Sequence, residues 1–191
     1  MSFRWSAVIG LCAVLVPACA PEKPAFRGSD LSGVAWGGDH ALTAHTGVPM
    51  RLSDARGKVA VLFFGYTHCP DICAPTLVKL AQARARMGAD AARVQVFFVS
   101  VDPAHDTPAQ LRQFLASFDP SFIGLTGTSA ETEAIARDYK ITATPGPAQR
   151  ITHSGGVFVR DRNGRLRLFL NESASVDDIV HDLEILVRER S

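Results

Sequence analysis

Residues 59–75 read VAVLFFGYTHCPDICAP, and this stretch decides which fold the chain can adopt. Its first seven residues, Val59 to Gly65, form an unbroken apolar run that is rich in β-branched and aromatic side chains. Such a run is typical of a strand buried on both faces, because a strand with one face in water alternates apolar and polar residues. We therefore expect a central strand here, inside a sheet that is covered on both sides.

The segments on either side of this strand alternate between strand-like and helical patterns. Capping signals at Thr107, Thr128 and Ser175 each precede a run with helical composition. The patterns predict helices over 77–87, 108–118, 128–139 and from 176 onward, and strands over 42–44, 50–52, 94–101, 122–125, 155–160 and 166–170. This alternation predicts an α/β fold with a central, mostly parallel sheet, flanking helices and a C-terminal hairpin, which suits the thioredoxin-like fold.

The composition is that of one globular domain. The chain has 191 residues, of which 47% are hydrophobic and 20% charged, so disordered and collagen-like classes are excluded. The formal net charge is +1, which gives no excess of positive charge to attract a polyanion. We therefore expect no nucleic-acid partner.

The N-terminus has the pattern of an export signal. Arg4 supplies a positive charge, and residues 7–16 form an apolar run that is too short to span a bilayer. Residues 16–19, VPAC, resemble a bacterial lipobox, which implies a signal peptide over 1–18 and lipidation of Cys19. The expected location is outside the bacterial cytoplasm, anchored to a membrane and facing the periplasm or the cell exterior. Ordinary cleavage near Ala20 and an uncleaved anchor are the alternatives.

Residues 19–39 are rich in proline, glycine and small polar residues and carry no sustained periodicity. This composition predicts a tether between the anchor and the folded domain. We expect the domain to span residues 40–191.

The chain has four cysteines, at positions 12, 19, 69 and 73, which are too few for a disulfide-stapled scaffold. Cys69 follows the central strand, Pro70 is expected to begin a helix, and Cys73 lies four residues after Cys69. That spacing brings two sulfurs to one helix face, and the helix N-terminus should favour their thiolate form. The pair predicts a redox disulfide or a soft-metal site, with inert core cysteines as the alternative.

Several motifs together resemble the SCO/SenC family of copper chaperones. The string GYTHCPDIC at 65–73 follows Arg56, Gly57 and Lys58, and three further segments occur in the family's order: SVDPAHDTP at 100–108, IGLTGT at 123–128 and PGP at 145–147. His153 follows in a THS context. The resemblance covers residues 26–188. It implies a thioredoxin-like fold, copper binding, and a role in assembling the CuA centre of cytochrome c oxidase.

Carried over to this sequence, the resemblance implies that Cys69 and Cys73 are thiolate ligands and that His153 is the imidazole ligand. Two thiolates and one imidazole suit copper, as Cu(I) or Cu(II), whereas structural zinc would lack a fourth ligand. The implied partners are the oxidase subunit that carries CuA and other copper chaperones. The segment before His153, AQRIT at 148–152, departs from the family, in which a tyrosine and an aspartate are common there.

Two functions remain open at this point. A copper chaperone would hold metal between the three ligands, whereas a thiol:disulfide oxidoreductase would cycle Cys69 and Cys73 through a disulfide to reduce partner cysteines before metallation. The presence of His153 favours the chaperone, and a peroxidase-like or signalling role is argued from the fold alone. Whether the protein is an enzyme therefore stays open. His68 is a candidate to tune Cys69, with a solvated side chain as the alternative, and Asp102 is a candidate to support or cap the site, with an exposed acidic face as the alternative. We expect the remaining histidines (His40, His45, His105 and His181) to be solvated.

Overall fold

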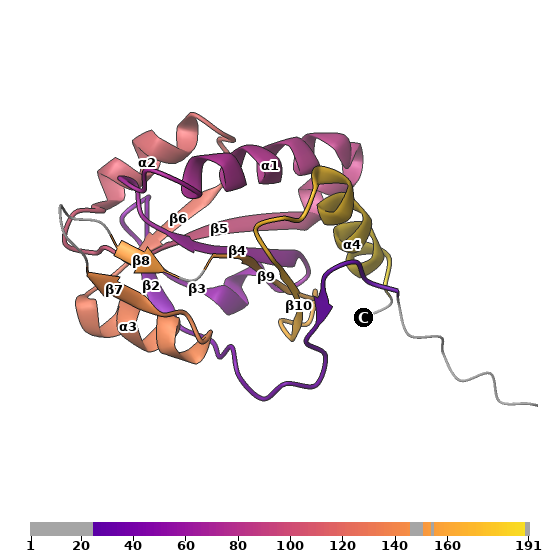
Figure 1. The fold of residues 1–191 in the computed structure, drawn as a ribbon, viewed down its shortest axis with the longest axis horizontal. Helices are drawn as coiled ribbons and strands as arrows, with labels where there is room; N and C mark the ends of the chain where they lie inside the picture. The colour runs from indigo at the N-terminus through magenta and orange to yellow at the C-terminus, as the bar shows by residue number, and fades with distance from the viewer. Residues whose placement is uncertain (1–24, 146–150, 154, 190–191) are drawn as a thin grey trace, which may run out of the picture.

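The structure, a computed structural model, describes residues 25–145, 151–153 and 155–189, with the backbone alone at 145 and 151–153. A central sheet is covered by helices on both faces (Figure 1). The expected signal peptide and Cys19 lie outside the described residues. Within the described part of the chain, no helix combines the length and apolar character needed to cross a membrane.

The main sheet has eight strands in the order β1-β10-β9-β4-β5-β6-β2-β3. Its central strands β4, β5 and β6 are parallel, and the remaining pairs are antiparallel. The bounds are β1 Ser29–Asp30, β2 Ala41–Ala44, β3 Pro49–Arg51, β4 Val59–Gly65, β5 Val94–Ser100, β6 Ile123–Thr126, β9 Val157–Arg160 and β10 Leu166–Leu170. The sheet is thus mixed rather than mostly parallel, because hairpins extend it at both edges.

The expected central strand is confirmed, since every residue of β4 is buried. Val61 and Phe63 face one apolar cluster, under α1, α2 and α4, while Leu62 and Phe64 face a second cluster under α3. The helices span Cys73–Arg86 (α1), Pro108–Ala116 (α2), Ser129–Asp138 (α3) and Val176–Arg188 (α4), with 3₁₀ turns at Leu52–Ala55 and Gly88–Arg93. Thr107, Thr128 and Ser175 cap α2, α3 and α4 as predicted.

Two features were not predicted from the sequence. A separate two-stranded sheet pairs β7 (Ala143–Pro145) with β8 (Ile151–His153). Residues 25–39, expected to belong to a tether, lie against the domain, where β1 pairs with β10 and the Leu31 amide donates to the Arg167 carbonyl. Neither feature can be recognised from the local sequence, because each strand is only two or three residues long and is held in place by pairing with another strand.

Candidate metal centre

The thiols of Cys69 and Cys73 meet where β4 leads into α1. Cys69 lies in a turn in which its amide donates to the Tyr66 carbonyl at 3.2 Å, and it is partly exposed. Cys73 is the first residue of α1 and is completely buried. The side chains of the two cysteines hydrogen-bond to each other. The helix begins at Cys73 rather than at Pro70, so the sulfurs meet across the turn before the helix and not along one helical face.

Gly65, the last residue of β4, gives Cys73 the room to approach the sheet. A Cβ atom at Gly65 would lie 2.7 Å from the Cys73 Sγ and 2.9 Å from the Phe98 ring. Both distances are shorter than an ordinary van der Waals contact, so a side chain here would have to displace the sulfur. The glycine therefore seats the buried thiol directly against the end of the central strand.

Cys73 is held as a neutral thiol in the metal-free protein. Burial raises the pKa of this thiol well above its usual range, and the contact with Cys69 raises the pKa further. The Tyr66 backbone opposes this rise with a hydrogen bond that lowers the pKa. The expectation that the helix N-terminus favours the thiolate is therefore wrong for Cys73, because the loss of solvation outweighs it. A metal that binds the sulfur must displace its proton.

Asp106 is a site-supporting residue that the sequence analysis missed. Its side chain is completely buried and accepts hydrogen bonds from the Thr67 hydroxyl (2.6 Å), the Thr67 amide (3.2 Å) and the Ser100 hydroxyl (2.7 Å). These bonds join the turn that carries Cys69 to the end of β5. The available signal was its place directly before Thr107, the cap of α2, inside a segment that carries the family resemblance.

Asp102, expected to support the site, has a different neighbour. Its carboxylate contacts the His105 Nδ1 at 2.9 Å, and its amide donates to the Ser100 hydroxyl. His68 is exposed, and its Nδ1 lies 3.1 Å from the Thr67 hydroxyl. Neither histidine contacts a cysteine in any described interaction, so the tuning role of His68 stays a prediction.

The remaining histidines are not simply solvated. His40 contacts Asp138, and His181 contacts Asp182, both at 2.9 Å. The ring of His45 accepts a hydrogen bond from the Gly124 amide. Each imidazole thus has a specific partner inside the fold, which explains their presence without a metal.

The backbone of His153 lies in β8, directly opposite Ala143 of β7. Because only the backbone of residues 151–153 is described, the imidazole stays a predicted ligand. Among the residues whose side chains the structure describes, no group of three or more histidines, cysteines or acidic residues is arranged to hold a metal. The structure therefore brings Cys69 and Cys73 together, and a complete three-ligand site depends on His153.

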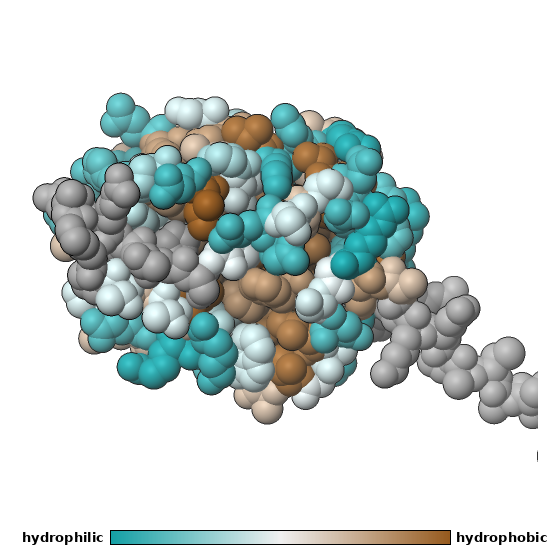
Figure 2. Space-filling view, in the orientation of Figure 1, coloured by the Kyte–Doolittle hydropathy of each residue, from teal (hydrophilic) through white to brown (hydrophobic). Residues whose placement is uncertain are grey.

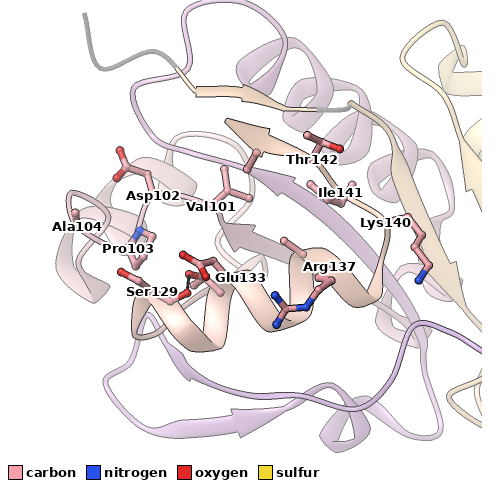
Figure 3. A pocket seen from close by; sticks show the side chains of 13 residues that line it. Val101, Asp102, Pro103, Ala104, Ser129, Glu133, Arg137, Lys140, Ile141 and Thr142 are labelled. Carbon is pink, nitrogen blue, oxygen red and sulfur yellow. Dashed lines mark hydrogen bonds between the residues drawn. The ribbon is translucent and has the colours of Figure 1, made fainter. Parts of the chain in front are cut away.

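A cavity of about 630 Å³ lies beside the β7–β8 hairpin. Figure 3 shows Asp102 and Glu133 toward one end of it and Arg137 and Lys140 toward the other. Ala143, the strand partner of His153, belongs to its wall. The cavity is therefore next to the backbone that carries the predicted imidazole, although it does not include either cysteine.

Comparisons with known proteins find relatives among the SCO proteins. The chain is 32% identical over 153 residues to the mouse "Protein SCO2 homolog, mitochondrial", a match that covers 76% of this chain and 60% of that protein. It is 38% identical over 121 residues to "Protein SCO2, mitochondrial" of Saccharomyces cerevisiae, covering 63% of this chain and 40% of that protein. The chain therefore spans less than two thirds of the length of either relative.

Solved structures agree with this fold. The copper-bound ScoI of Bradyrhizobium japonicum matches with a TM-score of 0.74 at 35% identity, covering 80% of this chain and 99% of that chain. The apo Sco1 of Thermus thermophilus matches with a TM-score of 0.76 at 36% identity, covering 84% and 96%. These matches confirm the thioredoxin-like α/β fold. The SCO1/SenC family model matches residues 29–188, and the protein therefore belongs to the SCO1/SenC family.

Proposed function

We propose that this protein is a membrane-anchored copper chaperone that binds copper through Cys69, Cys73 and His153 and delivers it to the CuA centre of cytochrome c oxidase. The observation that carries the proposal is the contact between the thiols of Cys69 and Cys73 at the end of β4. Support for copper comes from the ScoI of Bradyrhizobium japonicum and the yeast Sco1, whose structures were solved with copper bound.

Two thiolates and one imidazole suit a copper ion that the protein must first hold and then release. Thiolates are soft ligands that favour Cu(I), and the imidazole supplies one further nitrogen. Because Cys73 is a neutral thiol before binding, copper uptake releases its proton, and acid therefore favours release of the metal. A site with three protein ligands also leaves room for a ligand from the recipient during transfer.

The anchoring part of the proposal rests on the VPAC sequence at 16–19. Cleavage before Cys19 and lipidation of its thiol would place the domain outside the cytoplasm, at a membrane surface. Mass spectrometry of the N-terminal peptide tests this directly. An acylated Cys19 supports the anchor, and a mature chain that begins elsewhere contradicts it.

An anaerobic Cu(I) titration tests the copper site. The reduced protein should bind one copper, and Cys69→Ser or Cys73→Ser should abolish tight binding in competition with a Cu(I) chelator. His153→Ala should weaken binding by more than the ten- to a hundredfold that is typical of losing an outer hydrogen-bond partner, because it removes a direct ligand. The matched control is His105→Ala, which removes another imidazole near the site. If His153→Ala binds as tightly as this control, His153 is not a ligand.

The contact between the two thiols also favours a second function, a thiol:disulfide oxidoreductase. In that reaction a partner disulfide is reduced to two thiols while Cys69 and Cys73 lose two electrons and two protons and form a disulfide. His153→Ala separates the two functions in an oxidase-assembly assay. The chaperone function predicts that it fails like the double cysteine variant, whereas the reductase function predicts normal assembly.

A further inference from the structure

Residues 25–40, called the strap here, form a fixed part of the domain surface. Within the strap, β1 pairs with β10, and Leu31, Val34 and Trp36 pack against the apolar cluster under α3. The Trp36 ring meets the Phe158 ring edge to face at 6.0 Å. Figure 2 shows apolar side chains at the lower edge of the molecule, where the strap runs in Figure 1. The strap therefore has its own hydrophobic contacts with the domain.

Two carboxylates hold the strap at its two ends. Asp182 of α4 is completely buried and accepts hydrogen bonds from the amides of Arg27 (2.9 Å) and Gly28 (2.8 Å). Asp138 of α3 accepts one from the Gly38 amide at 2.7 Å and contacts the His40 ring at 2.9 Å. Breaking the first pair of bonds would leave a buried carboxylate without these donors, which opposes release of the strap. The strap is therefore held near both of its ends.

We infer that the strap shortens the tether to residues 19–24 and so holds the domain close to the membrane in one orientation. This inference rests on the anchor at Cys19 in the proposed function. Six residues span at most about 20 Å, whereas a tether that extended to residue 39 would reach about 70 Å. A domain of this size has a diameter on the order of 40 Å. Because the tether is shorter than the domain is wide, the domain cannot turn its far end toward the membrane.

The position of the attachment point decides which end of the domain faces the lipid. In Figure 1 the first described residues lie at the end of the long axis where the C-terminus is marked, and the β7–β8 hairpin lies toward the opposite end. Ser173 lines a small pocket together with Arg27 and Gly28, next to the attachment point. The side formed by β10 and α4 therefore faces the membrane. The end that carries the β7–β8 hairpin points away from it, toward the soluble part of a membrane-bound partner.

Depth-dependent fluorescence quenching tests the orientation. The full chain, purified with its native N-terminal modification, is reconstituted in phosphatidylcholine vesicles that contain a headgroup quencher. In a Cys69→Ser, Cys73→Ser background, one fluorophore is placed at Ser173→Cys beside the strap or at Ala104→Cys in the loop after β5. Quenching should be several times stronger at position 173 than at 104. Equal quenching at both positions overturns the inference.

Two controls separate the strap from the anchor. A flexible insertion of about 20 residues between Pro24 and Ala25 lengthens the tether outside the strap and should remove the difference between the two labels. Hydrogen exchange at the Arg27 and Gly28 amides should be slow in the wild type and at least tenfold faster in Asp182→Asn, with Asp177→Asn as the exposed control. Fast exchange in the wild type would show that the strap is not held against the domain. An unmodified Cys19 in the N-terminal peptide would show that the anchor is absent, whatever the exchange rates.

Discussion

The Thr67 hydroxyl and the Asp106 carboxylate are joined by a hydrogen bond of 2.6 Å, although the residues are 39 positions apart in the chain. Thr67 lies two residues before Cys69, so this bond connects the cysteine turn to the loop that precedes α2. The Ser100 hydroxyl donates to the same carboxylate at 2.7 Å. The position of the partly exposed Cys69 thiol is thus set by a residue that no local sequence pattern links to it.

Replacing Asp106 by asparagine should destabilise the protein by about 1–3 kcal/mol, because the amide group cannot accept all the hydrogen bonds that the buried carboxylate accepts. The cysteine turn should also become less ordered, which should slow formation of the Cys69–Cys73 disulfide on mild oxidation. Urea unfolding and thiol titration measure the two effects. Asp71→Asn is the control, since Asp71 is exposed in the same segment. Wild-type stability in Asp106→Asn would show that the network has no structural role.

Gly65→Ala should reduce both stability and copper affinity. The new Cβ would lie 2.7 Å from the Cys73 Sγ, so the sulfur must move away from its place beside the strand. Gly124→Ala is a matched control, because its Cβ would lie 2.9 Å from the Leu111 Cβ, away from the cysteines. Both variants should lose about 1–3 kcal/mol of stability from overpacking. Only Gly65→Ala should lose copper affinity in the chelator competition, and an equal loss in both would contradict this seating of Cys73.

His45 should make the fold sensitive to mild acid. Burial lowers the pKa of this imidazole, nearby Arg112 lowers it further, and the ring accepts a hydrogen bond from the Gly124 amide, which requires an unprotonated nitrogen. A depressed pKa means that the unfolded state binds the proton more readily. This contribution to stability is therefore present above pH ~6.5 and is lost as the pH falls through the folded-state value. Urea unfolding between pH 7 and 5 should show a weaker dependence on pH in His45→Gln, and identical slopes would rule out the effect.

Lys140→Gly should stabilise the protein by about 1 kcal/mol. Lys140 follows the end of α3 with a φ of 58°, the left-handed conformation that glycine adopts without strain. The Ile141 amide still closes the helix end by donating to the Ala136 carbonyl, and this bond does not involve the lysine side chain. Thermal unfolding measures the gain, with Lys140→Ala as the control that removes the charge but keeps the strain. A glycine variant no more stable than the alanine variant would contradict the backbone explanation.

The parts of the fold that depend on local patterns could be predicted. The apolar run of β4 and the capping residues Thr107, Thr128 and Ser175 carry their signals within a few neighbouring residues, and each lies where it was expected. The strap and its short strand β1 could not be predicted in this way. Their residues are short or polar segments that are stabilised by partners more than a hundred positions away, as Gly28 is by Asp182.

The candidate site divides in the same way. The proximity of Cys69 and Cys73 follows from their spacing after a strand, although the helix begins three residues later than expected. The protonation of Cys73 could not be read from spacing, because it depends on how deeply the folded protein buries the sulfur. Asp106 was missed for a related reason, since a carboxylate in a polar loop gives no sign in the sequence that it is completely buried.

The unequal exposure of the two thiols would set an order of events in the proposed metal exchange. A donor protein can approach Cys69, which is partly exposed, while Cys73 lies completely beneath the surface. If the protein carries copper as proposed, Cys69 would capture the metal first and Cys73 would bind it afterwards, and on delivery the recipient's ligand would compete at the Cys69 side. In the alternative reductase function, an attacking thiolate would meet the same sulfur first, so a mixed disulfide with a partner would form through Cys69 and would be resolved by Cys73.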